Sequence, residues 1–163
     1  MSSSVSDVAE DLIGLLGETV PALEAVGEEG SLKTRAPGRW SRKQTLGHLV
    51  DSALNNVQRF VRAQLQSDLW LPDYDPPGWV AACGYQDRPW ADLVALWTVL
   101  NVHLAHVIAR IPAAALETPC RIGDSEPMTL DFIVRDYMVH LRHHLQQILD
   151  PEASPGRTRE PFA

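Results

Sequence analysis

The sequence predicts an all-α protein built as a four-helix bundle. Within its 163 residues, four long segments show apolar residues at helical spacing, over positions 5–26, 41–66, 89–111 and 129–150. Strand-like alternation is not apparent between them. Two of the segments also carry histidines on a polar stripe, and bundle interiors commonly host metals held by side chains of facing helices. We expect one domain over residues 1–150 and a C-terminal tail over 151–163.

The first helical segment shows no sign of chemistry. Its apolar stripe consists of Val8, Leu12, Leu15, Leu16, Thr19, Val20 and Leu23. Pro21 lies inside the pattern and predicts a kink or a restart of the helix. The run Gly27-Glu-Glu-Gly30 should end it.

The second segment begins with a capping box, formed by Ser41 and Gln44. It carries a polar stripe at spacings of three or four, made of His48, Asp51, Ser52, Asn55 and Arg59. This stripe is either a solvated face or the wall of a metal site. In the second case His48 faces the metal, and Asp51 or Asn55 hydrogen-bonds the site.

A long connection over residues 67–88 joins the second and third helices. It is rich in proline and aromatic residues, and such long connections are often functional. One interpretation is a strap packed across the end of the bundle. The other is a lid over a pocket lined by Tyr74, Trp79 or Tyr85.

The third segment starts at Pro89 and stops at Ile111-Pro112, after which residues 113–127 read as a loop. Asn101 lies at the edge of its apolar stripe, as a buried polar contact or as a boundary residue. His103 and His106 are three residues apart, but they lie toward the outside of the stripe, so we expect both at the surface.

The fourth segment, capped by Thr129, contains the histidine motif. His140 and His144 are four residues apart, so on a helix they share one face and can reach one metal ion. His143 is one residue off and points elsewhere. A third ligand must come from another element, and His48 is the best candidate. Histidines that are incidental to function are the alternative.

The composition of the chain limits the classes of partner that we expect it to bind. The chain is 45% hydrophobic and 21% charged, with a net charge of −7. The absence of a basic cluster disfavours nucleic acid and anionic membranes as partners. The N-terminus lacks the features of a signal peptide, which leads us to expect a cytoplasmic protein. Cys83 and Cys120 could be free thiols, a disulfide or extra ligands; reduced, structural cysteines are favoured without a leader.

These features together resemble the DinB/YfiT-like family of four-helix-bundle metal proteins. The matching stretches, spread from Trp40 to Leu149, are Trp40-Ser41, Gly47-His48-Leu-Val-Asp51-Ser52, Asn55 to Phe60, Tyr74-Asp75, Trp79, Trp97 with Asn101, and Tyr137-x-x-His140-x-x-His143-His144-Leu-x-Gln147-Ile148. The resemblance implies a metal site of His48, His140 and His144, occupied by zinc or nickel. It also implies a homodimer, and an activity that joins a low-molecular-weight thiol to an electrophile.

We therefore expect a divalent-metal-dependent thiol transferase, with Asp51, Asn55 and Arg59 as candidate catalytic or substrate-contacting residues. A metal-dependent hydrolase and a non-catalytic metal-binding stress protein are the alternatives, since an open metal position serves water as well as a thiol. For the homodimer, the expected contact is an apolar surplus on the second helix, at Leu46, Leu49, Val57 and Phe60.

Overall fold

The structure, a computed structural model that describes residues 4–150, is a four-helix bundle. Its long helices are α1 (Val5–Ser31), α2 (Arg42–Ala63), α4 (Trp90–Ile108) and α5 (Leu130–Leu149). The predicted fold class is therefore confirmed. The predicted tail over 151–163 lies outside the described residues.

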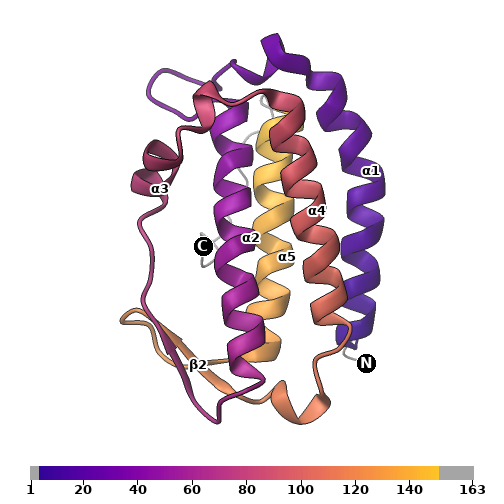
Figure 1. Ribbon diagram of the computed structural model, residues 1–163, viewed down its shortest axis with the longest axis vertical. Coiled ribbons are helices and arrows are strands. Elements are labelled where there is room, and N and C mark those ends of the chain that lie inside the picture. The colour runs from indigo at the N-terminus through magenta and orange to yellow at the C-terminus, as the bar shows by residue number, and fades with distance from the viewer. Residues whose placement is uncertain (1–3, 151–163) are drawn as a thin grey trace.

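The order of the helices around the bundle differs from their order in the chain. Both α1 and α2 pack against α4 and α5, so that the first two helices are diagonal partners (Figure 1). The N-terminal end of α2 and the C-terminal end of α5 lie at the same end of the bundle (Figure 1). This arrangement brings His48, near the start of α2, close to the histidines near the end of α5.

Helix α1 breaks at a glycine rather than at its proline. Non-helical backbone occurs at Gly27, whose φ of 66° is in the left-handed region that glycine tolerates. Pro21 lies in continuous helix, contrary to the expected kink or restart. Pro21 and Gly17, four residues before it, are both exposed, so water can satisfy the carbonyl that loses its helical partner.

The two connections contain regular structure that the sequence did not suggest. Residues 67–88 include β1 (Leu69–Leu71), helix α3 (Pro76–Cys83) and a 3₁₀ turn, η1 (Tyr85–Asp87). The loop before α5 contains η2 (Ala113–Ala115) and β2 (Pro119–Ile122), and β3 (Met128–Thr129) leads directly into the helix. The sequence shows no strand-like alternation here because elements of two to four residues are too short to display an alternating pattern.

The three strands form one small sheet in the order β1-β2-β3. β1 pairs with β2 in parallel, with Leu69 opposite Cys120 and Leu71 opposite Ile122. β2 and β3 are antiparallel. The sheet lies at the end of the bundle opposite the start of α2, and α3 runs beside α2 on the outside of the bundle (Figure 1). The connection therefore follows the side of α2 instead of crossing the bundle end.

The four residues that we expected to form a surplus apolar face on α2 do not form one. Leu46, Leu49 and Phe60 are fully buried inside the single chain, and Val57 is half-buried. These residues therefore give no support for a dimer contact, and the expected homodimer now depends on the resemblance alone.

One described helix, α4, is long and apolar enough to cross a membrane by length and composition alone. Its buried side includes Leu93, Trp97 and Leu104, and it packs against both α1 and α2. Core helices of globular bundles share this composition.

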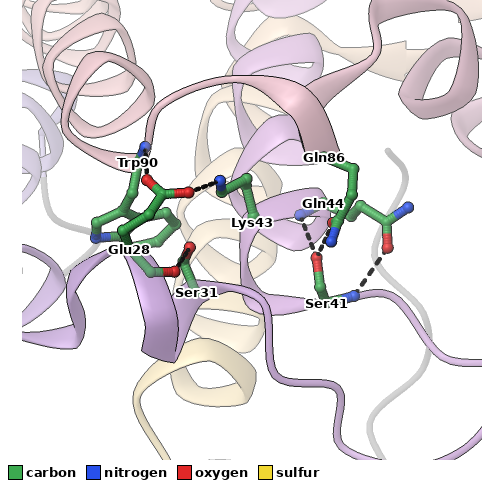
Figure 2. A network of polar contacts seen from close by, with 7 residues as sticks. All are labelled: Glu28, Ser31, Ser41, Lys43, Gln44, Gln86 and Trp90. Atoms are coloured by element: carbon green, nitrogen blue, oxygen red, sulfur yellow. Dashed lines mark hydrogen bonds and ion pairs between the residues drawn. The ribbon is translucent and has the colours of Figure 1, made fainter.

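A polar network holds the turn between α1 and α2 against the start of α4 (Figure 2). The Glu28 carboxylate accepts a hydrogen bond from the backbone N–H of Trp90 at 2.7 Å and pairs with the ammonium group of Lys43, whose side chain is buried. Beside it, Ser41 and Gln44 form the predicted capping box, and the Ser41 hydroxyl also donates to Gln86 at 2.7 Å. The network fixes where α2 and α4 begin.

We expect Glu28→Ala to lower the melting temperature by several degrees. It leaves the ammonium group of Lys43, whose side chain is buried, without its exposed anionic partner, and it removes the acceptor of the Trp90 N–H. A buried polar group that loses its partner destabilises the fold. Thermal unfolding should show that the double variant Glu28→Ala/Lys43→Met regains part of the loss. A double variant less stable than Glu28→Ala would contradict this.

Candidate metal centre

Three histidines from two helices converge in the bundle, and they are the three ligands that we predicted from the sequence. The ring centroids of His48 and His140 are 4.9 Å apart, those of His48 and His144 are 4.8 Å apart, and those of His140 and His144 are 4.6 Å apart. One nitrogen from each ring lies within 4.8 Å of the others. The capping box sets the start of α2, and hence the position of His48 in its second turn.

Burial keeps two of these rings neutral. His48 and His140 are almost fully buried. Burial, with the nearby His144, lowers the pKa of His48 to about 3. Burial and the neighbouring rings, His144 foremost, lower the pKa of His140 to about 2. Both side chains are therefore neutral at physiological pH, the state in which imidazole can bind a metal.

The donor set fits a divalent cation. The Nε2 atoms of His48 and His140 are 2.9 Å apart, close to the separation of about 3.3 Å between ligands of tetrahedral zinc. The Nδ1 atoms of both rings are buried without a hydrogen-bond partner among the described residues. Burying ring nitrogens without hydrogen-bond partners destabilises the folded chain. A cation that accepts the lone pairs of the facing nitrogens would offset part of that cost.

The remaining histidines lie elsewhere, as expected. His103 and His106 are exposed on α4. The ring of His143 lies next to that of His144, but its Nε2 atom is 2.9 Å from the side-chain nitrogen of Gln147. Only His48, His140 and His144 form a cluster of potential ligands among the residues that the structure describes.

Asp51 lies one turn after His48 on α2 and is completely buried. Its Oδ1 atom accepts a hydrogen bond of 2.5 Å from the hydroxyl of Tyr85 and a longer contact, 3.8 Å, from the thiol of Cys83. Its Oδ2 atom has no partner in the described part of the chain. Burial raises the pKa of the carboxyl group, and the Tyr85 hydrogen bond partly offsets this effect.

Arg59 and Asn55 occupy different environments. Arg59 is only 3% exposed, and its charge is near enough to contribute to the lowered pKa of His140. Burial lowers the pKa of the guanidinium group itself. Asn55 is half-buried, and its amide nitrogen donates to the backbone oxygen of Asp51 at 2.9 Å. The substrate contacts predicted for Arg59 and Asn55 remain predictions.

The connection contains the three aromatic residues that we expected to line a pocket. Tyr74 and Trp79 pack together with their ring centroids 5.0 Å apart, and the Tyr74 hydroxyl is buried without a partner among the described residues. Trp79 is more than one-third exposed, whereas Tyr85 is buried. Of the three expected lining residues, Tyr85 is the one that hydrogen-bonds to Asp51, one turn after His48 on α2.

Position 47 links this connection to α2. A Cβ atom built on Gly47 would overlap the ring of Tyr85, so only glycine lets η1 lie this close to the helix. We expect Gly47→Ala to destabilise the fold by about 1–3 kcal/mol, the usual cost of overpacking. Because Tyr85 must move, Asp51 should lose its hydrogen bond. Urea unfolding measures the first effect, and stability equal to that of the wild type would contradict it.

Two polar side chains singled out in the sequence, Gln147 and Asn101, make defined contacts. Gln147 is three residues after His144 and four after His143, so it shares their side of the helix. The Asn101 side chain, for which two interpretations were open, is a buried contact, and its Oδ1 atom accepts from the Tyr137 hydroxyl at 2.6 Å. Tyr85 lies 34 positions from Asp51, and no local pattern predicts their contact.

The cysteines are free thiols in the described chain, Cys83 exposed and Cys120 buried in β2. A disulfide between them is therefore excluded in this structure. Burial raises the pKa of Cys120 to about 11, which keeps it protonated and unreactive.

Comparison with known proteins gives two results. Residues 14–148 match the sequence model of the DinB superfamily. Among solved structures, the fold is similar to that of YfiT from Bacillus subtilis, described as a probable metal-dependent hydrolase with an unusual four-helix bundle topology. The TM-score is 0.76 at 22% sequence identity, over 88% of this chain and 85% of the other. A comparison with curated proteins gave no match.

Proposed function

Because this chain belongs to the DinB superfamily and three of its histidines converge, we propose that it is a metal-dependent enzyme that joins a low-molecular-weight thiol to an electrophilic small molecule. The observation that carries the proposal is the cluster of three imidazoles, two of which, His48 and His140, are buried and neutral. Three protein ligands leave at least one position of zinc or nickel open, which is typical of catalytic rather than structural sites.

The ligands in this proposal are His48, His140 and His144. A divalent ion held there supplies Lewis acidity, which lowers the pKa of a thiol from about 8.5 and fixes the position of its sulfur. The protein must then accept the proton and hold the electrophile. Both tasks fall to side chains around the centre.

Asp51 is the proposed proton acceptor. Its Oδ2 atom is free to accept a proton, since Tyr85 and Cys83 both contact Oδ1. Its raised pKa matches the task, because an acceptor works best when its pKa is closer to the working pH. The proton of the thiol moves to Asp51. The thiolate forms a bond to carbon as the electrophile releases halide, or as an epoxide opens and regains the proton at oxygen.

Arg59 and Asn55 are proposed to contact the electrophile. Arg59 offers a buried positive charge next to His140, which suits an electrophile that develops negative charge as its leaving group departs. The aromatic pair Tyr74 and Trp79 is proposed to shield this side from water.

The test is a conjugation assay with metal-loaded protein, in which glutathione, bacillithiol, mycothiol or cysteine is combined with a haloarene or an epoxide. We expect conjugate formation with at least one thiol and its loss in His140→Ala. Asp51→Asn should keep the metal but lose about 100-fold in rate, the lower end for removal of a general base. Rates equal to those of His140→Ala for every thiol would contradict a thiol transferase.

A metal-dependent hydrolase is the second candidate, and the observation that favours it is the similarity to YfiT, itself described as a probable hydrolase. The same Asp51 would then take a proton from water. Hydrolysis of an ester or amide that is lost in His140→Ala, without conjugation, would establish this alternative. Bound metal with neither activity would instead favour a non-catalytic metal-binding protein.

A further inference from the structure

The amide group of Gln147 lies between two neighbouring histidines of α5. Its Oε1 atom is 2.9 Å from Nδ1 of His144, and its Nε2 atom is 2.9 Å from Nε2 of His143. An amide oxygen only accepts hydrogen bonds and an amide nitrogen only donates them. The two contacts therefore assign the protons on both rings.

His144 must carry its proton on Nδ1, which donates to the oxygen of Gln147. A metal ligand must be a neutral imidazole, which has only one N–H group, so in that state Nε2 of His144 keeps its lone pair. His143 must accept at Nε2, so the lone pair of that atom is already used by the amide. Gln147 thus leaves Nε2 of His144 able to bind a metal, and it occupies Nε2 of His143 with a hydrogen bond.

We propose that Gln147 is a positioning residue that holds His144 in the Nδ1–H tautomer, with Nε2 available as a metal ligand, and keeps His143 out of the ligand set. This inference rests on the metal site proposed above. It explains why a helix with three histidines in five positions uses only His140 and His144. Partners of this kind orient metal-bound histidines and raise their basicity.

Two substitutions of Gln147 distinguish the role of its amide oxygen from that of its amide nitrogen. Gln147→Leu removes both contacts, and we expect metal affinity to fall 10- to 100-fold, the usual effect of losing such a partner. Gln147→Glu keeps an acceptor for Nδ1 of His144, so its affinity should stay within about tenfold of the wild type. Gln146→Leu, at the exposed neighbouring position, is the matched control and should bind like the wild type.

Affinity for zinc is measured by competition with a chromophoric chelator, and thermal unfolding of the metal-free variants shows that each is folded. Unchanged affinity in Gln147→Leu would overturn the proposal, as would equal losses in Gln147→Leu and Gln147→Glu. His143→Ala should retain wild-type affinity. A loss there as large as in His144→Ala would show that His143 is a ligand.

A second readout does not require metal. In the metal-free protein, ¹⁵N NMR of the imidazole rings should show His144 with a protonated Nδ1 and an unprotonated Nε2, and a mixture of tautomers in Gln147→Leu. A protonated Nε2 on wild-type His144 would overturn the inference. If the wild type binds no metal, the proposed site fails, while this spectrum still decides the role of Gln147.

Discussion

Replacing His144 with Ala should abolish stoichiometric metal binding. The variant loses one of three protein ligands, and we expect affinity to fall by more than the 10- to 100-fold typical of a residue that only orients a ligand. Protein purified without a histidine tag is loaded with zinc or nickel, and its metal content is measured by mass spectrometry.

The matched control is His103→Ala, which removes an exposed histidine from α4. This variant should retain one equivalent of metal. Equal metal content in the two variants would show that the three-histidine cluster is not the binding site.

The metal-free protein should lose stability as the pH falls from 7 to 5. The pKa values of His48 and His140 are about 3 and about 2 in the folded chain, whereas both should be near 6.5 in the unfolded chain. Below pH 6.5 the unfolded state therefore binds protons that the folded state rejects, and the free energy of unfolding decreases. At pH 5 the loss is about 2 kcal/mol for each ring.

Urea unfolding of the metal-free protein at pH 7 and pH 5 measures this effect. In His48→Gln/His140→Gln the decrease should be much smaller, because neither position can take up a proton. His103→Gln, the exposed control, should behave like the wild type. An identical decrease in the double variant would mean that other groups govern the acid sensitivity.

The metal-bound state should resist acid better than the histidine pKa of about 6.5 suggests. From the sequence alone, binding is expected to weaken as the pH passes through that value, because protonated imidazole cannot bind a metal. Burial lowers the pKa of His48 and His140, so protons compete with the metal for these rings only at far lower pH. Zinc titrations at pH 7 and pH 5.5 should therefore show little competition from protons at these two rings.

The long helices were predictable because their signals are local. The capping box at Ser41 and Gln44 fixes the start of α2, and the apolar stripes set which side of each helix is buried. The same periodicity placed His140 and His144 on one face. That His48 would meet them did not follow from spacing, because the contact joins residues 92 positions apart. His48 was the best candidate because it lies on the polar stripe of another helix, and the resemblance implied the same three ligands.

The features that the sequence did not reveal depend on long-range packing. The strands are too short to show a period, and β1 exists only because β2, 50 positions later, pairs with it. Tyr85 contacts Asp51 only because Gly47 leaves room for its ring. The polar stripe on α2 looked equally compatible with a solvated face, yet the structure buries four of its five residues, His48, Asp51, Ser52 and Arg59.

The most direct test of the metal centre is X-ray absorption at the zinc edge of tag-free protein that carries one equivalent of zinc. We predict three imidazole nitrogens at about 2.0–2.1 Å, together with a light ligand in the remaining position. The imidazole signal should fall in His140→Ala. A sulfur ligand at about 2.3 Å, or a shell of oxygen atoms without imidazole, would contradict a site built from His48, His140 and His144.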